Sequence, residues 1–101
     1  MSNAAYINAA QQRVLRILLM LAGHELMGLA PGEIAKALKT NPSNVTRDLA
    51  NLREAGMAEP LESGAWRITP RVSQIALRVL NSLGEARKRV DEVAQRFTVE
   101  R

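Results

Sequence analysis

The side chains best suited to chemistry in this sequence lie between residues 42 and 55, and they are hydrogen-bonding groups rather than catalytic ones. If this stretch is a helix, one of its sides carries five of them: Ser43, Asn44, Thr46, Arg47 and Asn51. Short hydroxyl and amide side chains beside a guanidinium suit base edges and phosphates in the major groove of DNA. An ordinary solvated helix face has the same composition and remains the alternative interpretation.

Other kinds of chemistry find little support in the sequence. It contains no cysteine and a single histidine, His24, which excludes thiolate and multi-histidine metal sites. It has no glycine-rich phosphate loop and no recognisable pair of catalytic carboxylates. The three aromatic residues, Tyr6, Trp66 and Phe97, are too scattered to stack on single-stranded bases. We therefore expect no enzyme, no cofactor and no metal.

The helix that must position these polar groups has clear ends. Asn41 is a favourable N-cap, and Pro42 follows at the first helical position, where its missing N–H costs nothing. A buried stripe at helical spacing predicts which side faces the core, and Gly56 is suited to the left-handed C-terminal cap. The stripe consists of Val45, Leu49 and Leu52.

A shorter helix is predicted immediately before it, over residues 31–38. Ile34, Ala35 and Leu38 form its inner side, and the small Ala35 lets the second helix approach closely. Glu33 stands three residues after Ala30, as in a capping box, but alanine has no hydroxyl and supplies only half of one. The two segments together predict a helix-turn-helix.

Two short strands follow and predict a small β-wing over residues 57–69. The strands are residues 57–61 and 65–69, and Glu62, Ser63 and Gly64 form the turn between them. Arg67 lies beside the tip of this hairpin, where a phosphate or minor-groove contact is plausible. A solvated strand residue is the alternative.

Helices are also predicted on both sides of this region. Residues 5–22 carry an apolar stripe that includes Ile7 and Ala10 at its beginning, and that beginning is also a candidate contact with a partner subunit. Residues 70 to about 97 form the last helix, capped by Thr69, with Gly84 as a weak point that could kink or break it. This helix carries a heptad seam, and we expect its later positions to form a dimer interface: Val79, Leu83, Ala86, Val90, Val93 and Phe97. The alternative is a helix folded back on its own monomer.

Three motifs carry a resemblance to a known family. They are Glu33-Ile34-Ala35, the run Ser43-Asn44-Val45-Thr46-Arg47-Asp48-Leu49, and Leu52 with Gly56. Over about residues 14–70 the chain resembles the winged helix-turn-helix of bacterial transcription regulators, the IclR-type domain most closely and the MarR group next. It departs from this pattern at Lys39, where the family has a turn glycine, and at Ala30. The resemblance implies that helix 42–55 enters the major groove and that wing 57–69 lies on the backbone or minor groove.

The charge distribution is compatible with a DNA-binding protein but does not require one. The net charge is +4, but residues 1–70 contribute only +1 and residues 71–101 contribute +3. The longest apolar run, residues 17–22, is far too short to span a membrane, and the N-terminus does not resemble a signal peptide. We therefore expect a cytoplasmic protein from a bacterium or phage, without a membrane partner.

These observations predict a fold that is mainly α with a small β-wing. We expect a winged helix-turn-helix domain over residues 1–70 and a C-terminal dimerisation helix over residues 71–101. The predicted function is a homodimeric transcription regulator that binds double-stranded DNA sequence-specifically, with any small-molecule effector unknown. The alternative is a winged-helix interaction module of a larger assembly, which the nearly neutral charge of residues 1–70 favours.

Overall fold

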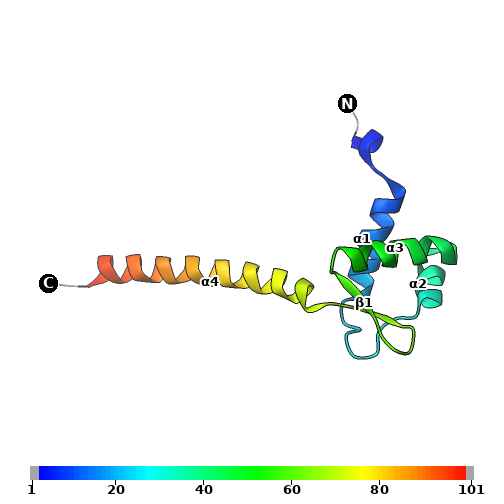
Figure 1. The fold of residues 1–101 in the computed structure, drawn as a ribbon. Coiled ribbons are helices and arrows are strands. Elements are labelled where there is room, and N and C mark those ends of the chain that lie inside the picture. Colours follow the sequence, from blue (N-terminus) through cyan, green and yellow to red (C-terminus); the bar gives the residue numbers. More distant parts are fainter. Residues whose placement is uncertain (1–2, 100–101) are drawn as a thin grey trace. The chain divides into compact units, whose positions relative to one another are not determined.

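The computed structural model describes residues 3–99 and contains, in that range, four α-helices and two short strands (Figure 1). The predicted fold class, mainly α with a small β-wing, is confirmed. The chain divides into two compact units, the first ending at Arg71 and the second beginning at Val72. In chain order the elements are a 3-10 turn (Asn3–Tyr6), α1 (Ala9–Leu21), α2 (Pro31–Leu38), α3 (Pro42–Glu54), β1 (Ala58–Pro60), β2 (Trp66–Ile68) and α4 (Pro70–Thr98).

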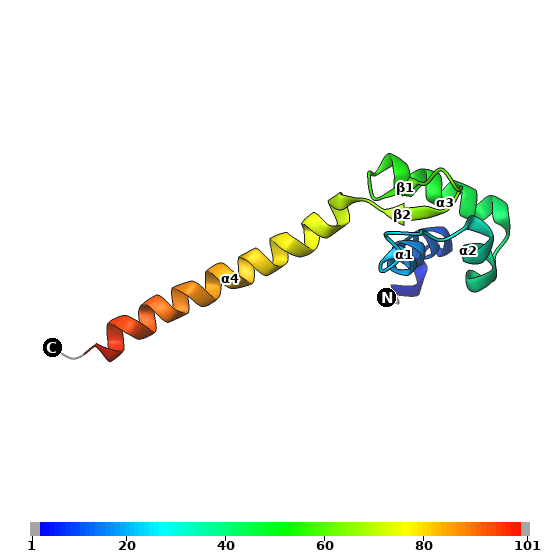
Figure 2. The same ribbon diagram turned by 90° about the horizontal axis from the view of Figure 1, so that it is seen from below.

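The core of the first unit lies between α1, α2, α3 and β1. The predicted stripe of α3 is buried there, and α1 and α2 contribute aliphatic side chains with no exposed surface. Each large aliphatic side chain buried in this way stabilises the fold by about 1.5–3 kcal/mol. The strands lie beside these helices, β1 against α3 and β2 against α1 (Figure 2). The buried apolar residues are Ile17, Leu21, Ile34, Ala35, Val45, Leu49, Leu52 and Ala58.

Helix α1 begins later than the apolar pattern predicts. Asn8 has an extended backbone (φ −108°, ψ 124°), and its side-chain oxygen accepts a hydrogen bond from the Gln11 N–H at 3.0 Å. Asparagine is one of the strongest N-cap residues, so it starts a new helix here instead of continuing one from residue 5. Ile7 is 62% exposed and Ala10 is exposed as well, so the beginning of the apolar stripe does not join the core of the first unit, and its contact with a partner subunit stays a prediction.

Helix α2 has the predicted bounds, and the turn that follows it contains a lysine in an unfavourable conformation. Lys39 has φ 53° and ψ 47°, the left-handed region that favours glycine. The turn is closed by the Lys39 N–H donating to the Lys36 carbonyl and the Thr40 N–H donating to the Ala35 carbonyl. At the other end of α2, the Glu33 carboxylate accepts a hydrogen bond from the Ala30 N–H at 3.1 Å, which is the predicted half of a capping box.

The wing is a hairpin that also pairs with the loop after α1, a contact that the sequence pattern does not indicate. Strands β1 and β2 pair antiparallel, with Glu59 opposite Arg67. Leu29, in the loop after α1, exchanges two backbone hydrogen bonds of 2.8 Å with Trp66. Gly28 precedes it at φ 71°, and a Cβ at this position would lie only 2.8 Å from the Trp66 carbonyl oxygen. The loop and the wing are therefore fixed to each other by a one-residue bridge that requires glycine beside it.

Helix α4 is continuous from Pro70 to Thr98 and passes through Gly84 without a break in its secondary structure. The residue before it, Thr69, is bonded to the segment between α3 and β1, since its N–H donates to the Met57 carbonyl and its hydroxyl donates to the Gly56 carbonyl. Among the helices of residues 3–99, none is long and apolar enough to span a membrane.

We predict that Lys39→Gly stabilises the protein. Relief of the left-handed lysine is worth roughly 1–2 kcal/mol and the extra freedom of glycine in the unfolded chain costs roughly 0.5–1 kcal/mol, so the free energy of unfolding should rise by about 0.5–1 kcal/mol. Urea denaturation followed by circular dichroism measures this change. Lys36→Gly is the matched control, because Lys36 is exposed and lies inside α2. This substitution should lower the free energy of unfolding by about 1 kcal/mol. Equal losses at both positions would contradict the assignment of strain to Lys39.

Candidate functional site

The outer side of α3 carries the five polar residues that the sequence singles out. Val45, Leu49 and Leu52 point into the core, and the opposite side is exposed to solvent apart from Asn44, which is half-buried. The residues of this outer face are Ser43, Asn44, Thr46, Arg47 and Asn51. The structure therefore places them together on one helix face, as predicted.

The short side chains of this face are ordered by hydrogen bonds to their own helix and to the turn before it. The Ser43 hydroxyl donates to the Asn41 side-chain oxygen at 2.9 Å, and the Thr46 hydroxyl donates to the Pro42 carbonyl at 3.0 Å. Asn51 donates from its amide nitrogen to the Arg47 carbonyl at 2.8 Å. Asn44 lies at the start of the helix, and its amide nitrogen donates to the Thr40 hydroxyl at 2.9 Å. The face is thus arranged before any partner binds.

Arg47 is the member of the face that is held least firmly. Its side chain is exposed, and its nearest acceptors are the Asn44 side-chain oxygen at 3.4 Å and the Ser43 carbonyl at 3.5 Å. Both distances exceed those of ordinary N–H···O bonds, which cluster near 2.9–3.0 Å. Among the described residues, no carboxylate forms a salt bridge with this guanidinium. Its charge is therefore available to an acceptor from outside the protein.

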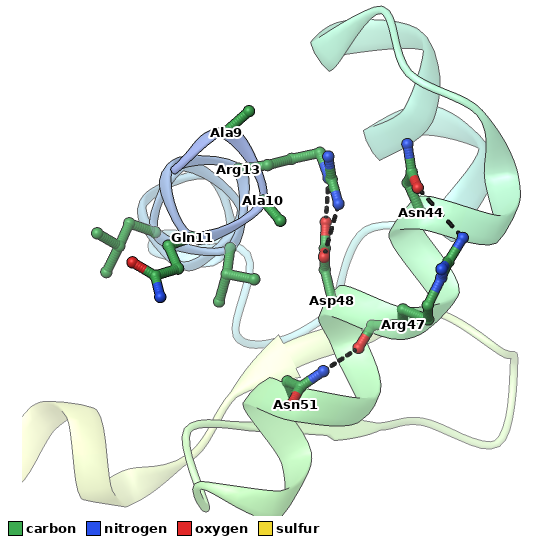
Figure 3. Close-up of a pocket in the computed structure, with 10 residues that line it drawn as sticks. Ala9, Ala10, Gln11, Arg13, Asn44, Arg47, Asp48 and Asn51 are labelled. Atoms are coloured by element: carbon green, nitrogen blue, oxygen red, sulfur yellow. Dashed lines mark hydrogen bonds and ion pairs between the residues drawn. The ribbon is translucent and has the colours of Figure 1, made fainter. Parts of the chain in front are cut away.

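The next residue, Asp48, is buried and paired. Its side chain accepts two hydrogen bonds from Arg13 of α1, from Nε and from Nη2, the latter at 3.1 Å (Figure 3). Asp48 is 3% exposed, and among residues 3–99 it is the one charged residue that is buried. Hydrogen bonding to Asp48, with the attraction of its negative charge, raises the pKa of Arg13 above its usual value. The guanidinium therefore stays charged throughout the pH range in which proteins are studied.

This ion pair is not among the residues selected from the sequence, although one signal does point to it. Asp48 lies three residues after Val45 and four before Leu52, so it stands on the buried stripe of α3. A carboxylate at such a position requires a cation. The partner is 35 residues away along the chain, and no local pattern identifies it.

A groove of about 760 Å³ separates the exposed parts of α1 and α3 (Figure 3). The α1 wall consists mainly of small or aliphatic side chains, and Arg13 lies on the same side. The α3 wall consists of Asn44, Arg47, Asp48 and Asn51, so three of the five outer-face residues border the groove.

Arg67 occupies a different environment from the residues of α3. It lies on β2, and its Nε donates to the Glu59 carboxylate of the opposite strand at 2.7 Å, both side chains being 37% exposed. Its Nη1 also lies 3.4 Å from the Glu25 carbonyl oxygen. The sequence does not indicate this pairing, which partly neutralises the positive charge predicted for the wing.

The predicted interface residues of α4 all lie in the second unit. Val79, Leu83, Val90, Val93 and Phe97 are between 52% and 83% exposed, and Ala86 is exposed as well. They repeat along one helix at steps of three and four residues, so they share a face. Within residues 3–99, histidine, aspartate and glutamate form no cluster of three that could hold a metal ion.

Comparison with protein families finds a match over residues 11–59 to the bacterial regulatory proteins of the arsR family. The matched residues run from the first turn of α1 to the middle of β1. The matched family is neither the IclR type nor the MarR group that the sequence motifs resemble. A search of curated proteins found no significant match.

Two solved structures, one of them a transcriptional regulator, have a similar fold. A variant of ZitR from Lactococcus lactis superposes with a TM-score of 0.52 at 22% identity over 85% of this chain, which spans 61% of the ZitR chain. A GntR family regulator from Listeria monocytogenes gives a TM-score of 0.53 at 21% identity, covering 93% of this chain and 87% of that one. At these identities the likeness establishes the fold, a winged helix-turn-helix.

Proposed function

We propose that this protein is a bacterial transcription regulator that binds double-stranded DNA, with α3 as its recognition helix. The observation that carries the proposal is the outer face of α3, where ordered amide and hydroxyl groups surround Arg47, a guanidinium with no carboxylate partner among the described residues. The match to arsR-family regulatory proteins over residues 11–59 and the winged-helix fold support it. Such a protein acts in the cytoplasm, where bacterial DNA lies.

Helix α3 has the dimensions and chemistry that major-groove recognition requires. It has 13 residues, one buried side and one polar side, and α2 precedes it after a short turn. In this arrangement the first turns of the second helix meet base edges. Arg47 is the residue suited to guanine, because a guanidinium can donate to O6 and N7 together.

The wing would make a smaller contribution than α3. Arg67 already pairs with Glu59, so a DNA phosphate would have to compete with that carboxylate. Glu62 at the hairpin turn adds further negative charge near the wing tip. We therefore assign the wing a weak backbone or minor-groove contact that changes affinity and does not read sequence.

We further propose that two copies associate through α4. The later part of α4 exposes Val90, Val93 and Phe97 on one face, and a single helix cannot bury its own side chains. An exposed apolar strip bordered by charges is typical of an association surface. Burial of each of these side chains would contribute about 1.5–3 kcal/mol. A dimer would present two copies of α3 to two half-sites on the duplex.

An interaction module within a larger assembly is the second candidate function. The observation that favours it is the charge of residues 1–70, which is only +1. Mobility shifts with a random duplex pool at two salt concentrations separate the two functions, since a DNA binder retains a selected subset and weakens as salt rises.

A relationship to IclR-type regulators, which the motifs between Glu33 and Gly56 suggest, also stays a prediction.

We predict that Arg47→Ala weakens binding to the selected duplex by about 1–3 kcal/mol, because a bidentate base contact is lost. Fluorescence anisotropy with the labelled duplex measures the change. Arg53→Ala is the matched control, since Arg53 is exposed in the last turn of the same helix and should matter less. Unchanged affinity with a folded protein would count against the recognition role of Arg47.

Two substitutions test the wing in opposite directions. Arg67→Ala should weaken binding to all duplexes alike and reduce the salt dependence by roughly one unit. Glu59→Gln should strengthen binding modestly, because it releases Arg67 from its carboxylate. Binding isotherms at several salt concentrations give both slopes. A sequence-selective loss with Arg67→Ala would instead assign base readout to the wing.

Truncation after Leu83 tests the role of α4 in association. The shortened chain retains all of the first unit and should fold, but it should shift toward monomer in sedimentation equilibrium and bind a two-half-site duplex more weakly. A full-length chain that is monomeric at tens of micromolar would overturn the dimer and favour a helix folded back on its own monomer.

A further inference from the structure

The groove between α1 and α3 contains one buried carboxylate and two guanidinium groups. Asp48 and Arg47 are consecutive in α3, and Arg13 reaches Asp48 from α1. In Figure 3 the Arg13 and Asp48 side chains face each other, while the Arg47 guanidinium turns toward Asn44. The Asp48 carboxylate is therefore paired with Arg13 of α1 and not with Arg47 beside it in α3.

This pairing decides the state of Arg47. Asp48 is almost fully buried and has Arg13 as its salt-bridge partner. A buried carboxylate without a cation is strongly unfavourable, so Asp48 would recruit another one if Arg13 were absent. Among the residues that line the groove, Arg47 is the other cation. Its contacts at 3.4–3.5 Å would offer little resistance to such a movement.

We propose that Arg13 is a positioning residue for DNA recognition: by holding Asp48, it keeps Arg47 directed outward. Without Arg13, the Arg47 guanidinium turns inward to Asp48, and the recognition face loses its cation although Arg47 is still present. This inference rests on the proposed role of α3, and it adds a residue of α1 that need not touch DNA.

The test is a double-mutant cycle on the full-length chain, with a duplex that the wild-type protein selects from a random pool. In the wild-type background, Arg47→Ala should weaken binding about tenfold to a hundredfold. In the Arg13→Gln background, the same substitution should cost less than about threefold, because Arg47 has already left the face. Adding Asp48→Asn to Arg13→Gln removes the competing carboxylate, so the cost of Arg47→Ala should return. A purely structural Arg13 predicts an equal cost in all three backgrounds, which would overturn the proposal.

A measurement without DNA separates this inference from the proposed function. The NMR signal of the Arg47 side-chain Nε–H should shift in Arg13→Gln and return in the double variant Arg13→Gln/Asp48→Asn. An unmoved signal in a folded Arg13→Gln protein refutes the reassignment of Arg47, whatever the DNA result. If Arg47→Ala has no effect on wild-type binding but the signal moves as expected, the proposed recognition role of Arg47 fails. The inference that Arg13 keeps Arg47 away from Asp48 then still holds.

A second variant covers the case in which Arg13→Gln does not fold. Asp48→Asn alone removes the buried carboxylate, so Arg47 has no carboxylate at position 48 to turn toward. The signal of Arg47 and the cost of Arg47→Ala should then equal those of the wild-type background. A shift of the Arg47 signal in Asp48→Asn would show that Asp48 already holds Arg47, which contradicts the proposal.

Discussion

The first unit depends on the burial of one side of α3. Val45, Leu49 and Leu52 have almost no exposed surface, and they pack among aliphatic side chains of α1 and α2 and against β1. Because a helix places its two sides in fixed relation, burial of this stripe also fixes the direction of the polar residues between its members. The caps at Asn41 and Gly56 set where the helix begins and ends, and hence which polar residues stand on its first turns. The outer face is thus determined by interactions on the opposite side.

Features with a local physical cause were predictable from the sequence. The starts of α2 and α3 follow from Pro31, Asn41 and Pro42, and the wing turn follows from Gly64, which has φ 91°. What the local pattern could not give are contacts between distant residues. The Leu29–Trp66 bridge and the Arg13–Asp48 pair join segments at least 35 residues apart, and no periodicity within either segment identifies its partner. The late start of α1 is different, because Asn8 is a local N-cap signal that competes with the apolar spacing before it.

The charges of the first unit explain how a nearly neutral domain can still offer a cation to a partner. Arg13 and Arg67 are both engaged by carboxylates of the same unit, one buried and one half-exposed. Arg47 is the arginine on the outer face of α3, and it forms no salt bridge among the described residues. The specificity of such a surface for DNA depends on where the Arg47 guanidinium is directed more than on the net charge of the unit.

The hydroxyl groups on the outer face of α3 have a consequence for the bases that the helix would prefer. Ser43 and Thr46 each donate their only hydroxyl proton to an oxygen that can solely accept, so what they present to solvent is lone pairs. Phosphate oxygens, guanine O6 and thymine O4 are acceptors and gain nothing from such groups. The exocyclic amines of adenine and cytosine are donors and fit them. A duplex that satisfies α3 without rearranging its side chains therefore offers guanine to Arg47 and amino-bearing bases to the two hydroxyls.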